Sequence, residues 1–184
     1  MKYDRTIIAY HGCDADVAER ILSGEPFQKS ENAYDWLGSG IYFWEYGHDR
    51  ALKFADFQRR SAKVTTPAVV GAVIQLGNCF DLMDTKHTAR LKAVYPLFRK
   101  ATQAAGRALP RNLGKTPDKK LRHRDCAFLN FYLQAVADEG LIYDTVRCAF
   151  LEGPPAFPGS AIRRERHIQL SETPLASWGS SAPC

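Results

Sequence analysis

The sequence lacks the features typical of membrane and disulfide-stabilised proteins. In its 184 residues no apolar run is long enough to span a bilayer, and residues 1–6 contain no apolar secretory signal. The five cysteines are scattered, with no Cys-x-x-Cys pair and no His/Cys cluster at zinc spacing. We therefore expect reduced thiols in a cytoplasmic protein, or in one delivered into a target cell without a cleaved signal, and no membrane or metal partner.

The sequence also lacks the common nucleotide-binding fingerprints. No Gly-x-Gly-x-x-Gly follows a strand-like run, and no P-loop is present. Strand-like and helix-like runs do not alternate as in a parallel βαβ sheet, so the pattern favours an α+β fold. No repeat or linker divides the chain. We expect a single domain over residues 1–172 and a flexible C-terminal tail over residues 173–184.

The periodicity of apolar residues predicts the main elements. Strands are expected over residues 5–10, 41–44, 67–76, 143–151 and 166–170, and helices over residues 14–22, 48–61, 86–105 and 121–139. The β-branched run 67–76 reads as a strand buried on both faces, and residues 79–82 are expected to extend the same sheet. Asp16 followed by Glu19 resembles a capping box, and Pro96 should kink or split the third helix.

Positive charge is the main compositional bias of the chain. The net charge of +5 is concentrated in residues 107–124 and 163–166. Such runs form solvated faces, or they contact RNA, DNA or the pyrophosphate of a dinucleotide. No nucleic-acid-binding motif accompanies them. Arg147 and the pair Arg163-Arg164 are the candidate phosphate contacts.

Two segments together resemble the halves of a nucleotide site. Tyr10-His11-Gly12 ends the first strand, and the flexible turn Gly38-Ser39-Gly40 precedes the aromatic strand Ile41-Tyr42-Phe43-Trp44. Glycine allows the backbone to approach a ligand closely. Aromatic rings on a strand offer flat faces for a planar ring. This combination predicts a site for a nucleotide.

In these residues the sequence resembles the ADP-ribosyltransferase superfamily, in its diphtheria-toxin-like and poly(ADP-ribose) polymerase-like branch. Members carry His-Gly on the first strand and later Gly-x-Gly-Ile-Tyr-Phe followed by a helix. The similarity covers residues 7–55. It implies a bacterial single-domain member with split antiparallel sheets flanked by helices, and NAD as co-substrate.

The resemblance also implies roles for individual residues. His11 matches the histidine that bonds the nicotinamide-side ribose, and Gly12 the glycine whose backbone clamps the carboxamide. Tyr42 matches the tyrosine that packs on the nicotinamide, and Phe54 stands where a second aromatic ring stacks. Gly40 belongs to the glycine turn of the motif. By the same resemblance, Cys13 stands where the family has Ser or Thr, and Arg50 lies near the carboxamide-binding serine.

The position of the catalytic carboxylate stays open. Transferases of this class carry Glu on the strand after the variable loop, here the strand over residues 166–170. Alternation along that strand places His167 and Gln169 on one face, which we expect to line the cleft. Gln169 could hold ribose hydroxyls, and His167 could act as a base near neutral pH. The candidate carboxylates are Glu45, Glu152 and Glu165.

These residues predict an NAD-dependent mono-ADP-ribosyltransferase that modifies a protein or a nucleic acid. The stiff loop over residues 152–160, with Phe157, stands where the superfamily reads its acceptor. A toxin, effector or phage-defence role is expected by resemblance, with an antitoxin or regulator as a further partner. Two alternatives remain: a degenerate fold that binds NAD or ADP-ribose without catalysis, and an RNA 2′-phosphotransferase-like enzyme.

Overall fold

The structure is a computed structural model that describes residues 3–116, 119–160 and 163–172. These residues contain six strands and four helices. The strands are β1 (Tyr3–Asp14), β2 (Ile41–Glu45), β3 (Pro67–Gly77), β4 (Cys79–Asp81), β5 (Thr145–Pro155) and β6 (Arg163–Glu172). The helices are α1 (Ala15–Leu22), α2 (His48–Arg59), α3 (Thr85–Ala104) and α4 (His123–Asp138). The predicted α+β class is confirmed, and the tail expected over residues 173–184 lies outside the described residues.

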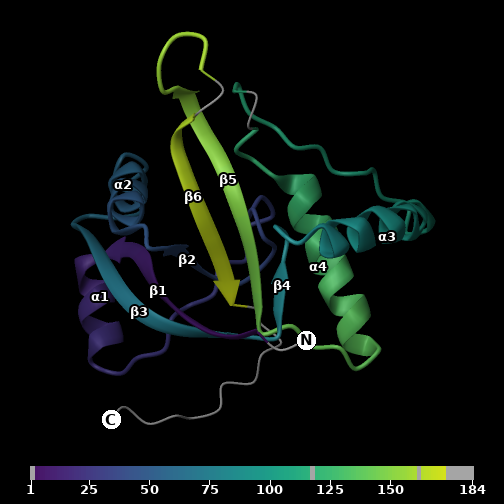
Figure 1. Cartoon of the computed structure of the whole chain (residues 1–184), viewed down its shortest axis with the longest axis horizontal. Helices are drawn as coiled ribbons and strands as arrows, with labels where there is room; N and C mark the ends of the chain where they lie inside the picture. Colours follow the sequence, from purple (N-terminus) through teal and green to yellow (C-terminus); the bar gives the residue numbers. More distant parts are fainter. Residues whose placement is uncertain (1–2, 117–118, 161–162, 173–184) are drawn as a thin grey trace.

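The strands form one curled sheet with the order β3-β1-β2-β6-β5-β4. Its two halves run in clearly different directions (Figure 1) and are joined where β2 pairs with β6 from Ile41 to Glu45. Every neighbouring pair is antiparallel except β4 and β5. The described strands thus form one continuous hydrogen-bonded sheet, whereas the resemblance implied split sheets.

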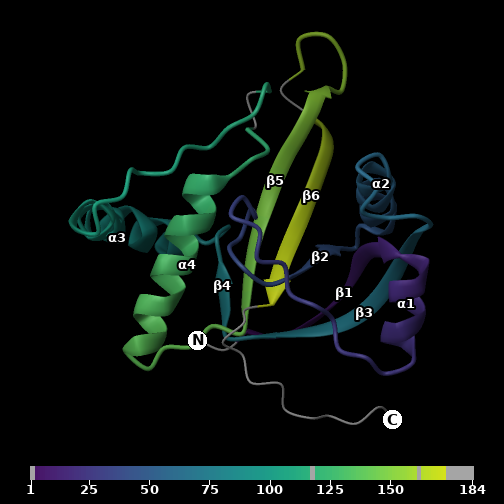
Figure 2. The same cartoon turned by 180° about the vertical axis from the view of Figure 1, so that it is seen from behind.

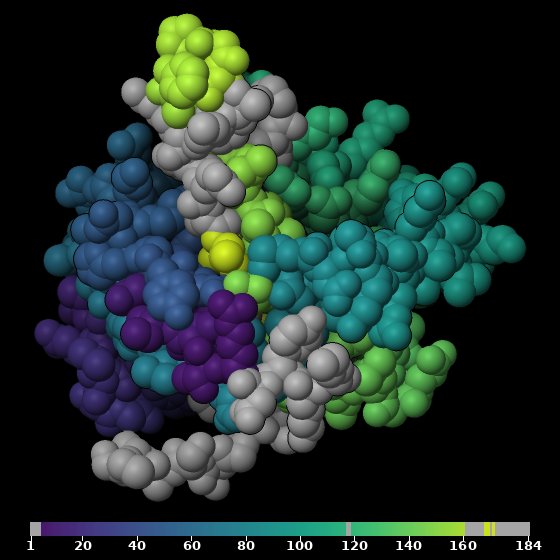
Figure 3. Space-filling model, in the orientation of Figure 1, coloured from purple at the N-terminus to yellow at the C-terminus, as the bar shows by residue number. Residues whose placement is uncertain are grey.

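Each half of the sheet has its own pair of helices. Helices α1 and α2 lie against β1 and β3, whereas α3 and α4 lie beside β4 and β5, as the view from behind also shows (Figure 2). On the surface, the α1–α2 half in purple and blue and the α3–α4 half in teal and green flank the central strands (Figure 3). Because the two halves are built from different segments, a site between them would be bounded by elements from distant parts of the sequence. None of the described helices is long and apolar enough to cross a bilayer.

The first helix begins at a different residue from the one predicted. Strand β1 continues through His11 and Gly12 to Asp14, and the Asp14 carboxylate caps α1 by accepting a hydrogen bond from the N–H of Asp16 (3.3 Å). The same carboxylate accepts from the backbone N–H groups of Thr65 and Thr66, just before β3. The Asp16–Glu19 capping box is therefore wrong. Asp14 both starts α1 and fixes the entry to β3.

Strand β3 is an edge strand, not a strand buried on both faces. Val70, Ile74 and Leu76 are buried, whereas the Val73 side chain is 76% exposed. A continuous β-branched run does not distinguish a central strand from an edge strand, because both faces of the run look apolar in sequence. As expected, residues 79–81 add a strand to the same sheet; this strand, β4, pairs with β5 at the edge opposite β3.

Helix α3 passes through Pro96 without a break, so the predicted split is wrong. Proline lacks the N–H that would bond the carbonyl four residues earlier, at Lys92. Both Lys92 and Pro96 are exposed, so water can satisfy that carbonyl. The basic segment between α3 and α4 contains no helix or strand among its described residues, as expected, apart from an isolated bridge between Leu113 and Leu121.

Candidate functional site

A cleft of about 1290 Å³ lies between α2, the segment that precedes β2, and the ends of β5 and β6. Small-molecule sites usually enclose roughly 300–1,000 Å³, so this cleft has room for a dinucleotide. It is lined by six of the seven residues predicted for the site: His11, Gly12, Gly40, Tyr42, Phe54 and Gln169. For the seventh, His167, the backbone pairs with Phe150 of β5, and its side chain lies outside the described residues.

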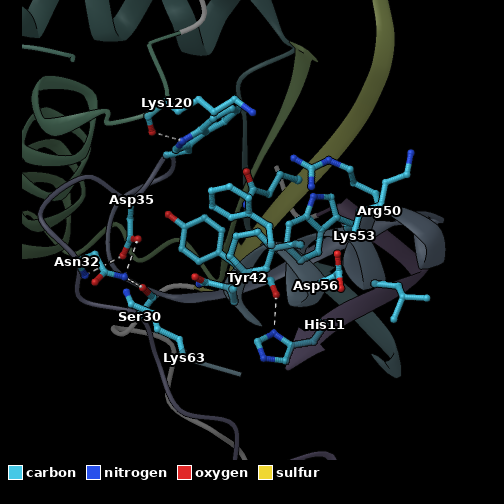
Figure 4. A pocket seen from close by; sticks show the side chains of 18 of the residues that line it. His11, Ser30, Asn32, Asp35, Tyr42, Arg50, Lys53, Asp56, Lys63 and Lys120 are labelled. Carbon is cyan, nitrogen blue, oxygen red and sulfur yellow. Dashed lines mark hydrogen bonds between the residues drawn. The ribbon is translucent and has the colours of Figure 1, made fainter. Parts of the chain in front are cut away.

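His11 is held by a backbone carbonyl of the neighbouring strand. Its Nδ1 lies 2.8 Å from the carbonyl oxygen of Tyr42 (Figure 4), and its ring packs against Phe27 and Phe43. A carbonyl only accepts, so Nδ1 carries the hydrogen and Nε2 of the neutral ring is an acceptor. Burial lowers the pKa of His11 below its usual 6.5, and the bond to Tyr42 only partly opposes this. His11 is therefore neutral at pH 7.

Gly12 is required by the packing of α2. A Cβ at this position would collide with the backbone carbonyl oxygen of Ala51, which is completely buried in α2. The absence of a side chain at Gly12 was expected to serve ligand binding; in the structure it also allows α2 to approach β1.

Strand β2 pairs with β1 only at Ala9 and Tyr10. The edge of β1 beyond Tyr10 is therefore not covered by β2, and its backbone groups can pair with a ligand.

Tyr42 is fixed by its hydroxyl group. The hydroxyl donates to the carbonyl oxygen of Gly38 (2.5 Å) and accepts from the N–H of Leu37 (2.8 Å). Burial raises the pKa of Tyr42 above its usual 10, so the hydroxyl stays protonated. A group already engaged in this way cannot serve as a proton donor or base. Tyr42 thus lines the cleft while its hydroxyl group is already used within the fold.

The glycine turn before β2 is held from outside. Asn130 of α4 accepts a hydrogen bond from the N–H of Ser39 (2.8 Å), and Gly38 adopts a φ of +81° beside it. A Cβ at Gly38 would lie 2.5 Å from Oδ1 of Asn130. The turn is therefore not the flexible element that its composition suggested. Asn130 was not found from the sequence because it is 91 residues away from Ser39.

Trp44 is a second residue that sequence reasoning missed. Its ring packs on Phe54, with centroids 4.9 Å apart, and it lies opposite Gln169 in the β2–β6 register. Nε1 of Trp44 and Oε1 of Gln169 are buried in the cleft, and neither has a hydrogen-bond partner among the described residues. Buried polar atoms almost always have partners. An ordered water or a bound ligand would satisfy this donor and this acceptor. Strand alternation from Tyr42 could have identified Trp44.

Glu45 and Arg147 belong to the interior of the fold. The Arg147 guanidinium donates two hydrogen bonds to Glu45 (2.6 and 2.9 Å) and one to Asp81 (2.9 Å), and all three residues are at least 92% buried. None of them lines the cleft. Arg147 is therefore not a contact for a pyrophosphate, and Glu45 is not available as a catalytic carboxylate. The pairing of Arg147 was invisible in sequence because its partners lie on β2 and β4.

Glu152 is the candidate carboxylate that the structure places in the cleft. Of the described acidic residues that line it, Glu152 alone is buried, with 2% of its surface exposed. Its carboxylate pairs with Arg50 of α2 (2.6 Å) and with Lys120 from the segment before α4 (3.3 Å). Glu165 lies opposite Glu152 in the β5–β6 register, and its side chain lies outside the described residues.

Comparison with known proteins gives little information about this cleft. No family model matches the chain, and no solved structure matches it. An uncharacterised protein of Methanocaldococcus jannaschii is 30% identical over 101 residues, which are 53% of this chain and 46% of that protein. The chain thus spans less than half the length of this relative, whose name states no activity. A function for the cleft has to be inferred from its own residues.

Proposed function

We propose that this protein is an NAD-dependent mono-ADP-ribosyltransferase that modifies a macromolecule. The observation that supports this most is the convergence of His11, Gly12, Tyr42, Phe54 and Gln169 in one cleft, although they come from four separate elements. The proposal includes an ADP-ribosyltransferase-like arrangement of strands. The differing directions of the two halves of the sheet support that part (Figure 1).

Each of these residues offers what one part of NAD needs. The open edge of β1 at Gly12 can pair with the nicotinamide carboxamide, because the backbone groups of Gly12 face the same side as the Ile8 carbonyl that bonds Tyr46. Tyr42 and Phe54 present ring faces for the nicotinamide. Nε2 of the neutral His11 accepts a hydrogen bond from a ribose hydroxyl. Nε1 of Trp44 and Oε1 of Gln169 can then bond further hydroxyls that would otherwise lose hydration.

The reaction breaks the bond between C1′ of the ribose and the nicotinamide nitrogen. The electron pair of this bond leaves with nicotinamide, and C1′ becomes positively charged, as in an oxocarbenium ion. A lone pair of the acceptor then bonds to C1′, and the proton of the acceptor passes to a base or to water. Positioning of the ring and a negative charge near the ribose lower this barrier. Glu152 is the carboxylate we assign to this role, because it is buried and lines the cleft.

A second function is favoured by one specific residue. Gln169 stands on the strand where transferases of the class carry Glu, and an amide supplies no charge to the ribose. A protein that binds NAD or ADP-ribose without turnover, as a sensor or subunit, would need only the hydrogen bonds of this side chain. The two functions share the binding site and differ in whether Glu152 acts on bound NAD.

Measurement of binding and turnover on the same preparation separates these functions. The full chain is titrated with NAD by calorimetry, and then incubated with isotopically labelled NAD and a lysate. The transferase predicts release of nicotinamide and mass-labelled protein or nucleic acid. Binding without release supports the second function. A wild-type protein that does not bind NAD contradicts both, and His11→Ala, if it still melts cooperatively, must lose the affinity.

A further inference from the structure

The ion pairs of Glu152 bring into the site two cations, Arg50 and Lys120, that the NAD site described so far does not use. Arg50 lies in the first turn of α2, Glu152 near the end of β5, and Lys120 three residues before α4. Nη2 of Arg50 is 2.6 Å from one oxygen of Glu152, and Nζ of Lys120 is 3.3 Å from the other. All three residues line the cleft. In Figure 4, Lys120 and His11 lie at opposite ends, with Tyr42 between them.

Lys120 is held through its backbone and Arg50 through its guanidinium, and both side chains are at least partly exposed. Nε1 of Trp36 donates to the carbonyl oxygen of Lys120 (2.8 Å), which fixes this point of the chain. The Arg50 guanidinium lies 5.6 Å from the centre of the Trp44 ring. The side chains of Arg50 and Lys120 are 21% and 56% exposed, whereas that of Glu152 is 1% exposed. A ligand in the cleft can therefore reach both cations without moving the backbone.

We propose that Arg50 and Lys120 form a diphosphate-binding subsite and that Glu152 competes with the ligand for them. A diphosphate carries more negative charge than one carboxylate, and its oxygens can meet both the planar guanidinium and the ammonium group. The diphosphate replaces Glu152 as the partner of Lys120 and binds Arg50 together with Glu152. The Glu152 carboxylate then has less positive charge close to it. This inference rests on the NAD-dependent function only for the source of the diphosphate, which is the dinucleotide.

Such competition gives the diphosphate a second effect within the proposed reaction. A buried carboxylate without its counter-ions is costly, and the cost is reduced by any positive charge that develops nearby. The ribose of NAD develops this charge as nicotinamide leaves. Binding of the diphosphate therefore releases Glu152 to interact with the ribose, so Glu152 weakens binding of the ligand while favouring the reaction.

The test is the affinity for ADP, with inorganic pyrophosphate and adenosine as comparison ligands, measured by calorimetry on the full chain. Glu152→Gln removes the competing charge and should bind ADP and pyrophosphate about tenfold more tightly, which corresponds to about 1.4 kcal/mol. Lys120→Gln should bind both about tenfold more weakly, whereas Lys115→Gln, in the same basic segment but outside the cleft, should not. Adenosine should be insensitive to all three changes. Melting curves confirm that each variant is folded.

Two results would overturn the subsite: a folded Glu152→Gln with unchanged or weaker affinity for ADP, or equal affinities of Lys120→Gln and Lys115→Gln. Lys120 is mostly exposed, so the second comparison remains decisive even if Glu152→Gln does not fold. Failure of the transferase function is recognised separately. In that case the variants show the expected changes in ADP affinity, but the wild-type protein releases no nicotinamide from NAD. If nicotinamide is released but the variants do not show the expected changes in ADP affinity, the transferase function is supported and the diphosphate subsite is refuted.

Discussion

The close contact between Gly12 and α2 predicts that a side chain at position 12 lowers the stability of the fold. In Gly12→Ala the added Cβ meets the backbone oxygen of Ala51, an obstacle that no change of side-chain rotamer can relieve. Ala51 and Ala55 are completely buried, so α2 cannot shift without disturbing its packing on β1. Overpacking of a well-packed core costs about 1–3 kcal/mol. For a chain of this size each kcal/mol lowers Tm by about 2–4 °C. We therefore expect a decrease in Tm of about 2–12 °C.

Gly71→Ala is the matched control, because Gly71 lies on the neighbouring strand. There a Cβ would lie 3.4 Å from the Tyr10 ring, and the residue is exposed. Alanine is intrinsically favoured over glycine in a strand by about 0.5–1 kcal/mol, so this variant should be at least as stable as the wild type. Ala51→Gly should not rescue Gly12→Ala, since the obstacle is a backbone atom. Equal Tm values for Gly12→Ala and Gly71→Ala would refute the close approach of α2 to β1.

Further predictions concern the cleft and the interior. The folded-state pKa of His11 is lowered by burial, so protonation below pH 6.5 should remove its acceptor and weaken NAD binding, with a flat profile above that pH. The unfolded chain binds this proton more readily, so His11 should also make the wild type lose stability as pH falls below 6.5, a slope absent in His11→Asn. Trp44→Phe keeps an aromatic ring but removes Nε1, and should weaken NAD binding severalfold. Because Trp44 is only 3% exposed, the smaller ring should also lower Tm, so affinity is compared well below Tm; equal affinity would contradict a ligand at that atom. Arg147→Met removes the cation that two buried carboxylates share, of which Glu45 keeps only the longer ion pair with Arg5 (3.6 Å), and should cost about 3–5 kcal/mol in urea unfolding; a loss below 1 kcal/mol would argue against the ion network. Asn130→Ala should release the Gly38 turn, weaken NAD binding, and speed hydrogen exchange at Ser39.

The sequence was most informative where local chemistry decides the structure. The existence of β2 and α2 follows from alternation and helical spacing. Of the six predicted site residues that share one cleft, five were chosen by the motif resemblance over residues 7–55, and Gln169 by alternation along its strand. Their chemical roles in NAD binding and turnover remain predictions that the experiments above test.

The sequence was least informative where long-range pairing decides. Arg147 reads as a surface cation until β2 and β4 place two carboxylates around it. β3 reads as a central strand because its neighbours are not encoded in its own composition. Asn130 and Lys120 act on the cleft from the other half of the fold, and no spacing rule connects them to β2. Partners such as these, separated by 66 to 102 residues, are set by topology, which local periodicity does not specify.

The junction of β2 and β6 has a consequence for when the protein becomes functional. His11 and Tyr42 are synthesised early, but Gln169 reaches the floor of the cleft only after β6 has been added between β2 and β5. A nascent chain that ends before residue 163 thus carries the early half of the site and lacks the strand that completes it. Because the order of synthesis fixes which segments can pair first, affinity for the nucleotide should appear only after β6 has left the ribosome and has paired with β2.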